Sequence, residues 1–129
     1  MHDREKRDDD VLRFVQEEID SVPELEALLL VWQQRPRAWS AEQLAGRLYI
    51  RSEQAREILI GLTRKQLISA GAPETYLYED VSTEQDQLMA HLEETYRREI
   101  VRISNLIHSK PSSAVRDFAR AFRFTKEKG

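Results

Sequence analysis

The stretch SAEQLAGRLYIRSEQAREILIGLTRKQLISA, which runs from Ser40 to Ala70, decides the fold that we predict for this chain. Apolar residues recur in it at intervals of three and four, which is the periodicity of helices with one buried face. Ser40 and Gln43 have the spacing of a capping box, and Ser52 is a second residue of the type that begins helices. We therefore predict two helices that begin near these serines, separated by a short turn over 49–51.

Further helices and two short strands are predicted on both sides of this stretch. Upstream, the apolar spacing predicts helices over 11–19 and 23–34, and Pro36 ends the second because proline cannot continue a helix. Downstream, two strands are predicted over 67–70 and 75–79, joined by a tight turn. The expected fold class is therefore mainly α, with a small two-stranded sheet.

A long helix is predicted over 83–108 because its apolar residues form one stripe at intervals of four and three. The stripe consists of Leu88, Leu92, Tyr96, Ile100, Ile103 and Ile107. Pro111 ends this helix, and a short basic amphipathic helix with Phe118 and Phe122 on one side is expected after it. We expect four parts: a disordered charged arm over 1–10, a domain over 11–80, the long helix over 81–109, and a C-terminal helix and tail over 110–129.

Length and composition limit the classes to which the protein can belong. Its 129 residues correspond to one domain, and the absence of Cys excludes disulfides and thiolate metal sites. The longest apolar run, from Ala27 to Trp32, is far shorter than the roughly 20 residues of a membrane helix. The charged N-terminus lacks the apolar core of a signal peptide. These features predict a cytoplasmic protein without a membrane span.

The stretch from Ser40 to Glu79 resembles the winged helix-turn-helix transcriptional regulators of the MarR-like and related bacterial families. In these families a helix of the form xxxLAxxL is followed by a turn, by a helix of the form xxVxxxLxxL and by a first wing strand of the type GLI. Tyr49 stands where the family usually has Gly, so a left-handed residue there would be strained and another turn shape is the alternative. The residues that match the three patterns are Leu44, Ala45 and Leu48, then Ala55, Leu59 and Leu62, then Gln66, Leu67 and Ile68.

The resemblance implies a non-enzymatic transcriptional regulator that binds duplex DNA with its second helix in the major groove. Arg can bind guanine, and Gln can bind adenine, through paired hydrogen bonds. The residues expected to contact DNA are Arg47, Arg51, Ser52, Gln54, Arg56, Arg64 and Lys65. The alternative is a winged-helix protein–protein interaction module or adaptor without DNA binding, which is favoured by Glu53, Glu57 and the acidic tip at Glu74.

The C-terminal part of the sequence offers further partner sites. The apolar stripe on the helix over 83–108 would be covered in a homodimer, which is our preferred interpretation, or would pack lengthwise on its own domain. Phe118 and Phe122 have three interpretations. They dock onto the chain's own domain or a sister subunit, they bind a protein partner, or they contact an anionic membrane.

No catalytic residue, cofactor or metal site is expected. Each of the four Gly residues stands alone, so the sequence has no Gly-rich loop for phosphate groups. His91, Glu93 and Glu94 share one predicted helix, but their spacing is too loose to predict a metal site. We therefore expect a binding protein and not an enzyme.

Overall fold

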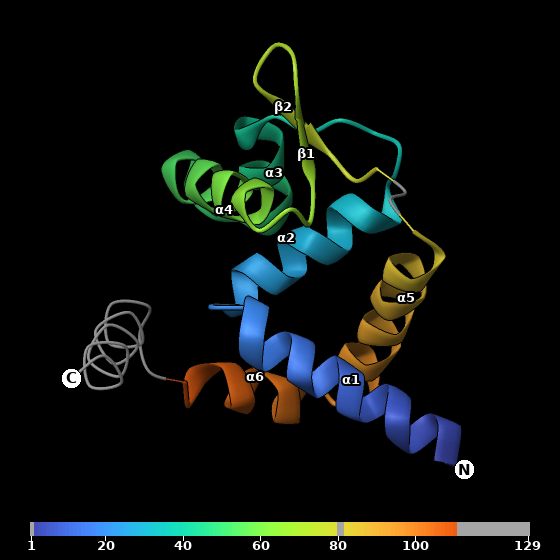
Figure 1. Cartoon of the computed structure of the whole chain (residues 1–129). Helices are drawn as coiled ribbons and strands as arrows, with labels where there is room; N and C mark the ends of the chain where they lie inside the picture. Colours follow the sequence, from blue (N-terminus) through green and yellow to red (C-terminus); the bar gives the residue numbers. More distant parts are fainter. Residues whose placement is uncertain (1, 80–81, 111–129) are drawn as a thin grey trace, which may run out of the picture.

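The computed structural model describes residues 2–79 and 82–110 (Figure 1). Within these residues the chain forms six helices and one two-stranded antiparallel sheet. The prediction of a mainly helical fold with a small two-stranded sheet is therefore confirmed. In chain order the elements are α1 (His2–Glu18), α2 (Val22–Gln33), α3 (Ala41–Leu48), α4 (Ser52–Arg64), β1 (Ser69–Gly71), β2 (Thr75–Leu77), α5 (Thr83–Arg98) and α6 (Ile100–His108).

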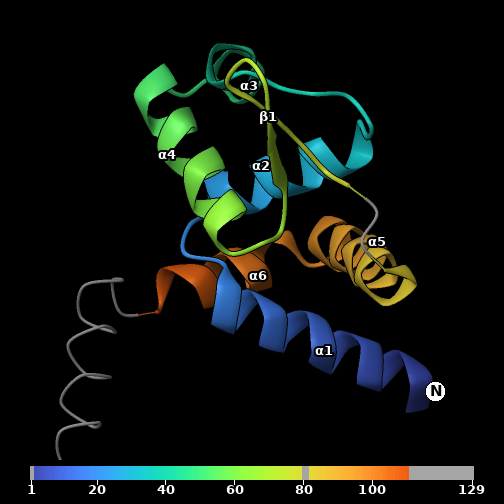
Figure 2. The same ribbon diagram turned by 45° about the horizontal axis from the view of Figure 1, so that its top comes forward.

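The elements form two groups that meet at α2. Helices α3 and α4 and the sheet lie on one side of α2, whereas α1, α5 and α6 lie on the other (Figures 1 and 2). α2 contacts α3, α4 and α5, while α1 packs against α5 and α6. Every residue of α2 from Glu24 to Trp32 except Glu26 is buried, because a helix that is apolar on nearly all sides must be central.

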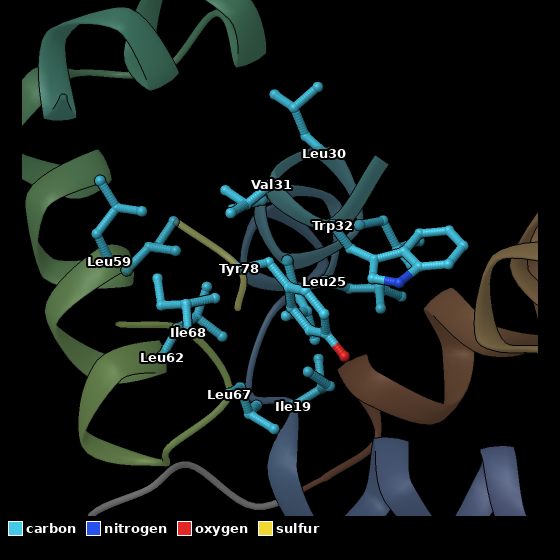
Figure 3. Close-up of a cluster of buried hydrophobic side chains, with 14 of the residues drawn as sticks. Ile19, Leu25, Leu30, Val31, Trp32, Leu59, Leu62, Leu67, Ile68 and Tyr78 are labelled. Carbon is cyan, nitrogen blue, oxygen red and sulfur yellow. The ribbon is translucent and has the colours of Figure 1, made fainter. Parts of the chain in front are cut away.

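The core fills the space between α2, α4 and the strands. Figure 3 shows Leu25 and Val31 of α2 in one cluster with Leu59 and Leu62 of α4 and with Tyr78, which follows β2. Four of these five side chains, all but Tyr78, are completely buried. Burying one such apolar side chain contributes about 1.5–3 kcal/mol, so the period of three and four residues in α4 fixes which of its sides faces inward.

Trp39 extends the small sheet, which the sequence patterns did not predict. Its backbone N–H donates to the carbonyl oxygen of Tyr76 at 2.7 Å, and the Tyr76 N–H donates back to the Trp39 oxygen at 2.8 Å. The Trp39 side chain is buried, and the guanidinium carbon of Arg37 lies 4.0 Å from its ring centre. This bridge ties the segment before α3 to β2, so the sheet and α3 are held together.

The expectation of a disordered arm over 1–10 is wrong, because α1 begins at His2. Asp8 of this segment lies 3.3 Å from the guanidinium of Arg98 in α5, and α1 packs along α5. Lys, Arg and Glu are good helix formers, so a charged stretch continues a helix once its neighbouring turns are docked. The polar turns therefore belong to a helix whose apolar residues start at Val11.

The expectation of one continuous helix over 83–108 is also wrong, since the helix breaks at Glu99. Glu99 has φ −128° and ψ 50°, outside the helical region, and separates α5 from α6. The break lets both halves pack against α1, with Leu92 buried on one side of it and Ile103 on the other. The Glu99 carboxylate lies 3.0 Å from the guanidinium of Arg102, one turn into α6.

The turn between α3 and α4 adopts the strained shape and not the alternative one. Tyr49 has φ 58° and ψ 43°, which is the left-handed helical region, and its side chain is 94% exposed. The Ile50 N–H donates to the carbonyl oxygen of Ala45 at 3.1 Å and closes the end of α3. The predicted C-terminal helix with Phe118 and Phe122 lies outside the described residues.

Candidate nucleic-acid interface

The N-terminal end of α4 is exposed and has no side-chain cap. Ser52 is the first helical residue and not the capping residue, because the N-cap position is occupied by Arg51, whose side chain makes no capping hydrogen bond. The first backbone N–H groups of a helix have no partner within the helix and carry the positive end of its dipole. Arg51 and Ser52 are exposed, Gln54 is half-buried, and Arg51 makes no ion pair with the described part of the chain. Donors and positive charge therefore gather at this end.

One side of α4 faces away from the rest of the domain. Ala55, Ile58, Leu59 and Leu62 are buried, so the residues opposite them are exposed at helical intervals of four, three and four. We call this surface the α4 outer face and define it by Glu53, Glu57, Ile60 and Arg64. Two acidic residues, Glu53 and Glu57, precede Ile60, which is 40% exposed, and the basic Arg64 follows it.

Arg56 lies beside the α4 outer face but is paired with an acidic side chain. Its guanidinium lies 3.2 Å from a carboxylate oxygen of Glu42 in α3. Both side chains are well exposed, and pairs of this kind are worth about 0–1 kcal/mol. The pair therefore lowers the local positive charge without fixing Arg56 in place.

Lys65, at the C-terminal end of α4, is used within the fold. Its ammonium lies 3.0 Å from Glu24 and 3.1 Å from Asp20, and it also donates to the carbonyl oxygen of Glu18. Glu24 is only 6% exposed although it is charged. This placement differs from the expectation that Lys65 flanks a DNA backbone, because the partners that surround the ammonium are internal.

A second lysine, Lys110, reaches the same end of α1. Its ammonium donates to the carbonyl oxygen of Val15 at 3.0 Å and to that of Ile19. Burial lowers the pKa of Lys110, and the nearby ammonium of Lys65 lowers it further. Burial raises the pKa of Glu24, while the hydrogen bond and charge of Lys65 oppose that rise. Two ammonium groups thus neutralise the carbonyl end of α1.

Arg47 lines a separate groove. This groove has a volume of about 410 Å³ and lies between α2, α3, α5 and the start of α6. Its wall includes Glu26 and Tyr96, whose carboxylate and hydroxyl oxygens are 3.5 Å apart. Burial, followed by the charge of Glu26, raises the pKa of Tyr96. The structure therefore divides the expected basic residues among the start of α4, its outer face, an internal cluster and this groove.

The predicted dimer stripe is largely covered by its own chain. Leu92, Ile103 and Ile107 are buried, whereas Leu88 and Tyr96 are half-buried. Only Ile100 of the six is exposed, at 50%, and the neighbouring Val101 is exposed at 69%. The lengthwise packing that we considered as an alternative describes this arrangement, so the complete stripe is not a free surface.

The sequence patterns gave no sign of the Glu24–Lys65–Lys110 cluster. Its members are 41 or more residues apart along the chain, and each one alone resembles an ordinary surface charge. Glu24 stands in the first turn of α2, where acidic residues are common, so its burial leaves no signal in the sequence. The exposed end at Arg51, in contrast, follows directly from the start of the second predicted helix.

Residues 2–79 and 82–110 contain no group of three or more His, Cys, Asp or Glu that is arranged to hold a metal ion. In the same part of the chain, every helix is too short or too polar to span a bilayer. Comparison of the chain with protein-family models, curated proteins and solved structures yields no match.

Proposed function

We propose that this chain is a non-enzymatic transcriptional regulator of the winged helix-turn-helix type, which binds duplex DNA with the N-terminal end of α4. The order α3, turn, α4, β1, β2 supports this proposal, as does the bridge between Trp39 and β2. The observation that carries it is the exposed, uncapped start of α4 at Arg51 and Ser52. A helix N-terminus with an adjacent arginine fits a phosphate group of the DNA backbone.

Each residue at this end has a distinct role in the proposal. Arg51 and the first N–H groups of α4 bind a phosphate and set the orientation of the helix in the groove. Gln54, one turn further on, reads a base edge, for which adenine is the best match. Arg56 adds a base or phosphate contact after it exchanges Glu42 for DNA, which requires little energy because the pair is exposed.

The proposal includes a homodimer, and its contact is placed at the break between α5 and α6. Ile100 and Val101 are adjacent, exposed and apolar, unlike the buried members of the stripe. A twofold dimer presents two reading helices to a palindromic site. Val101→Asp is expected to convert the dimer to a monomer in sedimentation equilibrium, with Arg13→Asp as the exposed control on α1. A wild-type chain that is monomeric at high concentration would contradict this contact.

A second candidate function is supported by the charges of the α4 outer face. Glu53 and Glu57 interrupt the basic residues, Glu42 pairs with Arg56, and Lys65 is held inside. Ile60 adds an exposed apolar side chain to this face, and a protein partner would bury it. The second candidate is therefore a winged-helix module that binds a protein partner and not DNA.

The experiment that tests the first proposal measures binding to mixed genomic duplex fragments over a salt series. We expect the logarithm of the affinity to fall linearly with the logarithm of the salt concentration, because phosphate contacts release counterions. Arg51→Ala is expected to weaken binding on all sequences and to reduce the slope by about 1. Gln54→Ala is expected to weaken binding mainly to the preferred sequences.

Arg13→Ala serves as the matched control, because Arg13 is exposed on α1 and, among the described residues, pairs only with Asp10 of the same helix. This variant should bind DNA as the wild type does. A correctly folded wild-type chain that shows no binding even at about 50 mM salt would overturn the DNA proposal, since nonspecific binding is strongest there. The protein-binding candidate would then take its place.

A further inference from the structure

The coil between α2 and α3 carries two arginines that each stack on a tryptophan ring. The guanidinium carbon of Arg35 lies 4.6 Å from the ring centre of Trp32. That of Arg37 lies 4.0 Å from the ring centre of Trp39. An arginine stacks through the flat face of its guanidinium, so the N–H groups, which point outward in that plane, stay available to acceptors. What each arginine binds therefore depends on the acceptors around it.

Arg35 has its acceptors inside the chain. It lies 3.3 Å from a carboxylate oxygen of Asp86 in α5 and donates to the carbonyl oxygen of Trp32 at 2.7 Å. The same carboxylate accepts a hydrogen bond from the indole N–H of Trp32 at 2.8 Å. Arg35 therefore belongs to the contact between α2 and α5, where Asp86 neutralises its charge.

Arg37 is exposed, and its side chain makes no hydrogen bond or ion pair with residues 2–79 and 82–110. Its support is rigid, because Trp39 is only 1% exposed and is joined to Tyr76 of β2 by backbone hydrogen bonds of 2.7 and 2.8 Å. A cation that is already held on a rigid support loses little freedom when it binds a ligand. The stack on Trp39 therefore prepares Arg37 for an anion from outside the described chain.

Arg37 lies on the side of the molecule that holds the start of α4. Figures 1 and 2 show the coil before α3, then α3, and then the start of α4 on the side away from α1 and α6. Arg37 precedes the first residue of α3 by four positions, and Arg51 follows its last residue by three. The 8 residues of α3 span about 12 Å at 1.5 Å per residue. Arg37 and Arg51 are therefore placed to contact different phosphate groups of one bound duplex.

The turn between β1 and β2 offers no cation for this purpose. Its residues 71–74 are exposed, and Glu74 is the only charged residue among them. A carboxylate repels a phosphate group, so this tip does not favour a backbone contact. Trp39 pairs with β2 on the edge opposite β1, and Arg37 thus supplies positive charge beside the sheet where its tip has none.

We propose that Arg37 binds a backbone phosphate of duplex DNA and is a second anchor besides the start of α4. This inference rests on the proposed function and adds a positioning residue to it. Phosphate groups are alike in every sequence, so Arg37 contributes affinity and orientation but no sequence preference. With two separate anchors, α4 is held in one orientation in the groove and cannot turn about Arg51.

A salt series with the full chain and mixed genomic duplex fragments tests the contact. Arg37→Gln should weaken binding to all fragments alike and reduce the slope by about 1 per bound chain. Arg35→Gln is the matched control, since Arg35 also stacks on a tryptophan but is neutralised by Asp86, and its slope should equal that of the wild type. Arg37→Gln combined with Arg51→Ala should reduce the slope by about 2, because the two residues contact different phosphates.

Charge rescue separates a phosphate contact from a structural role, because the natural sequence contains no Cys. Arg37→Cys is alkylated either with 2-bromoethylamine, which adds a positively charged aminoethyl group to the sulfur, or with iodoacetamide, which adds a neutral group. We expect the aminoethylated chain to recover most of the lost slope and the neutral chain to keep the reduced slope. Arg13→Cys, which replaces an exposed arginine of α1, should show the wild-type slope in both forms.

Four results would overturn the role of Arg37. They are a wild-type slope for Arg37→Gln, equal losses for Arg35→Gln and Arg37→Gln, a loss of only about 1 in the double variant, and equal slopes for the two alkylated forms. In each case a reduced slope for Arg51→Ala would leave the proposed function intact. If the folded wild-type chain does not bind DNA at about 50 mM salt, the proposed function fails and the role of Arg37 fails with it.

Discussion

The two ends of α4 carry basic residues that look equivalent in the sequence but have opposite surroundings. At the N-terminal end, Arg51 is exposed and leaves the helix uncapped. At the C-terminal end, Lys65 is held by Glu24, Asp20 and a backbone carbonyl of α1. The partners of these two cations determine their roles: Lys65 compensates a buried carboxylate and stabilises the fold, whereas Arg51 is available to a ligand.

The C-terminal end of α4 contributes to the stability of the fold because its Lys65 lies next to the buried Glu24. Removing a carboxylate from water costs several kcal/mol, and a nearby ammonium compensates this cost only while it is present. The ion pair itself adds little net stability. Losing Lys65 would nevertheless destabilise the fold, because the buried carboxylate of Glu24 would then have no compensating charge. No comparable penalty applies to Arg51, because water surrounds it.

The largest effect is expected for Lys65→Met, which retains most of the side-chain volume and removes the charge. Glu24 then remains buried without its main partner, and the free energy of unfolding should fall by about 3 kcal/mol. Urea denaturation followed by circular dichroism measures this change. Arg64→Met, one residue earlier and exposed, should change stability by less than about 0.5 kcal/mol.

Glu24→Leu added to Lys65→Met should recover much of the lost stability, because an apolar residue replaces the unpaired charge. The double-mutant cycle then gives a coupling energy between the two positions. Equal costs for Lys65→Met and Arg64→Met would contradict the comparison, since the two ends of α4 would then be alike.

A smaller effect is expected from pH, because Lys65 already offsets part of the burial of Glu24. Burial raises the pKa of Glu24 above 4.5, so the folded chain binds this proton more tightly than the unfolded chain. The contribution of Glu24 to stability is therefore complete below pH 4.5 and is lost as the pH rises through the raised pKa. The free energy of unfolding, measured against pH for the wild type and Glu24→Gln, should show this fall as the difference between the curves. A rise over the same window would mean that Lys65 outweighs burial.

The opposite end of α4 is expected to respond to a capping residue. Arg51→Asp supplies an acceptor for the free N–H groups and a negative charge at the positive end of the helix dipole. The variant should gain about 1 kcal/mol in stability and lose DNA binding. Arg51→Asn is the control, because it supplies a cap without reversing the charge, and it should gain stability with a smaller loss of affinity. Thermal unfolding and the salt series measure the two properties.

If Arg51→Asp were less stable than the wild type, Arg51 would have a structural role that its exposed position does not indicate. If it were more stable and still bound DNA, the candidate interface would lie elsewhere. Stability and binding therefore have to change in opposite directions at this end. At the other end of α4, the loss of Lys65 is expected to reduce stability directly.

The parts of the fold that could be predicted are those that local patterns determine. The capping box at Ser40 is formed as expected, with the Gln43 N–H 3.1 Å from the serine hydroxyl and the Ser40 N–H 3.0 Å from the glutamine side chain. The apolar spacing of α4 correctly indicated Ala55 and Leu59 as buried. Such features depend on neighbours three or four residues away, so the sequence contains the necessary information.

The parts that could not be predicted depend on contacts between distant residues. The break at Glu99 interrupts a regular apolar pattern without Pro or Gly, and only the packing of both halves on α1 explains it. The helical turn that contains Asp8 is held by the ion pair with Arg98. Lys65 is placed inside the fold by its ion pair with Glu24. For the candidate site, the exposed start of α4 could be predicted from the sequence. The pairing of Lys65 with Glu24 inside the fold, which removes Lys65 from the candidate site, could not.

The smallest effect is expected at Tyr49, the left-handed residue that precedes the exposed end of α4. This conformation costs an L-amino acid about 1–2 kcal/mol, whereas glycine adopts it freely but loses about 0.5–1 kcal/mol more chain entropy on folding. The tyrosine side chain is exposed and adds little packing, so Tyr49→Gly should raise the free energy of unfolding by about 0.5 kcal/mol. Tyr49→Ala keeps the backbone strain and should show no gain in stability, which separates strain relief from removal of the ring.

A stabilised Tyr49→Gly chain with weaker DNA binding would extend the candidate interface to the turn. The backbone strain at Tyr49 would then serve to hold the tyrosine ring against the ligand. An unchanged affinity would limit the interface to Arg51 and the helix that follows it.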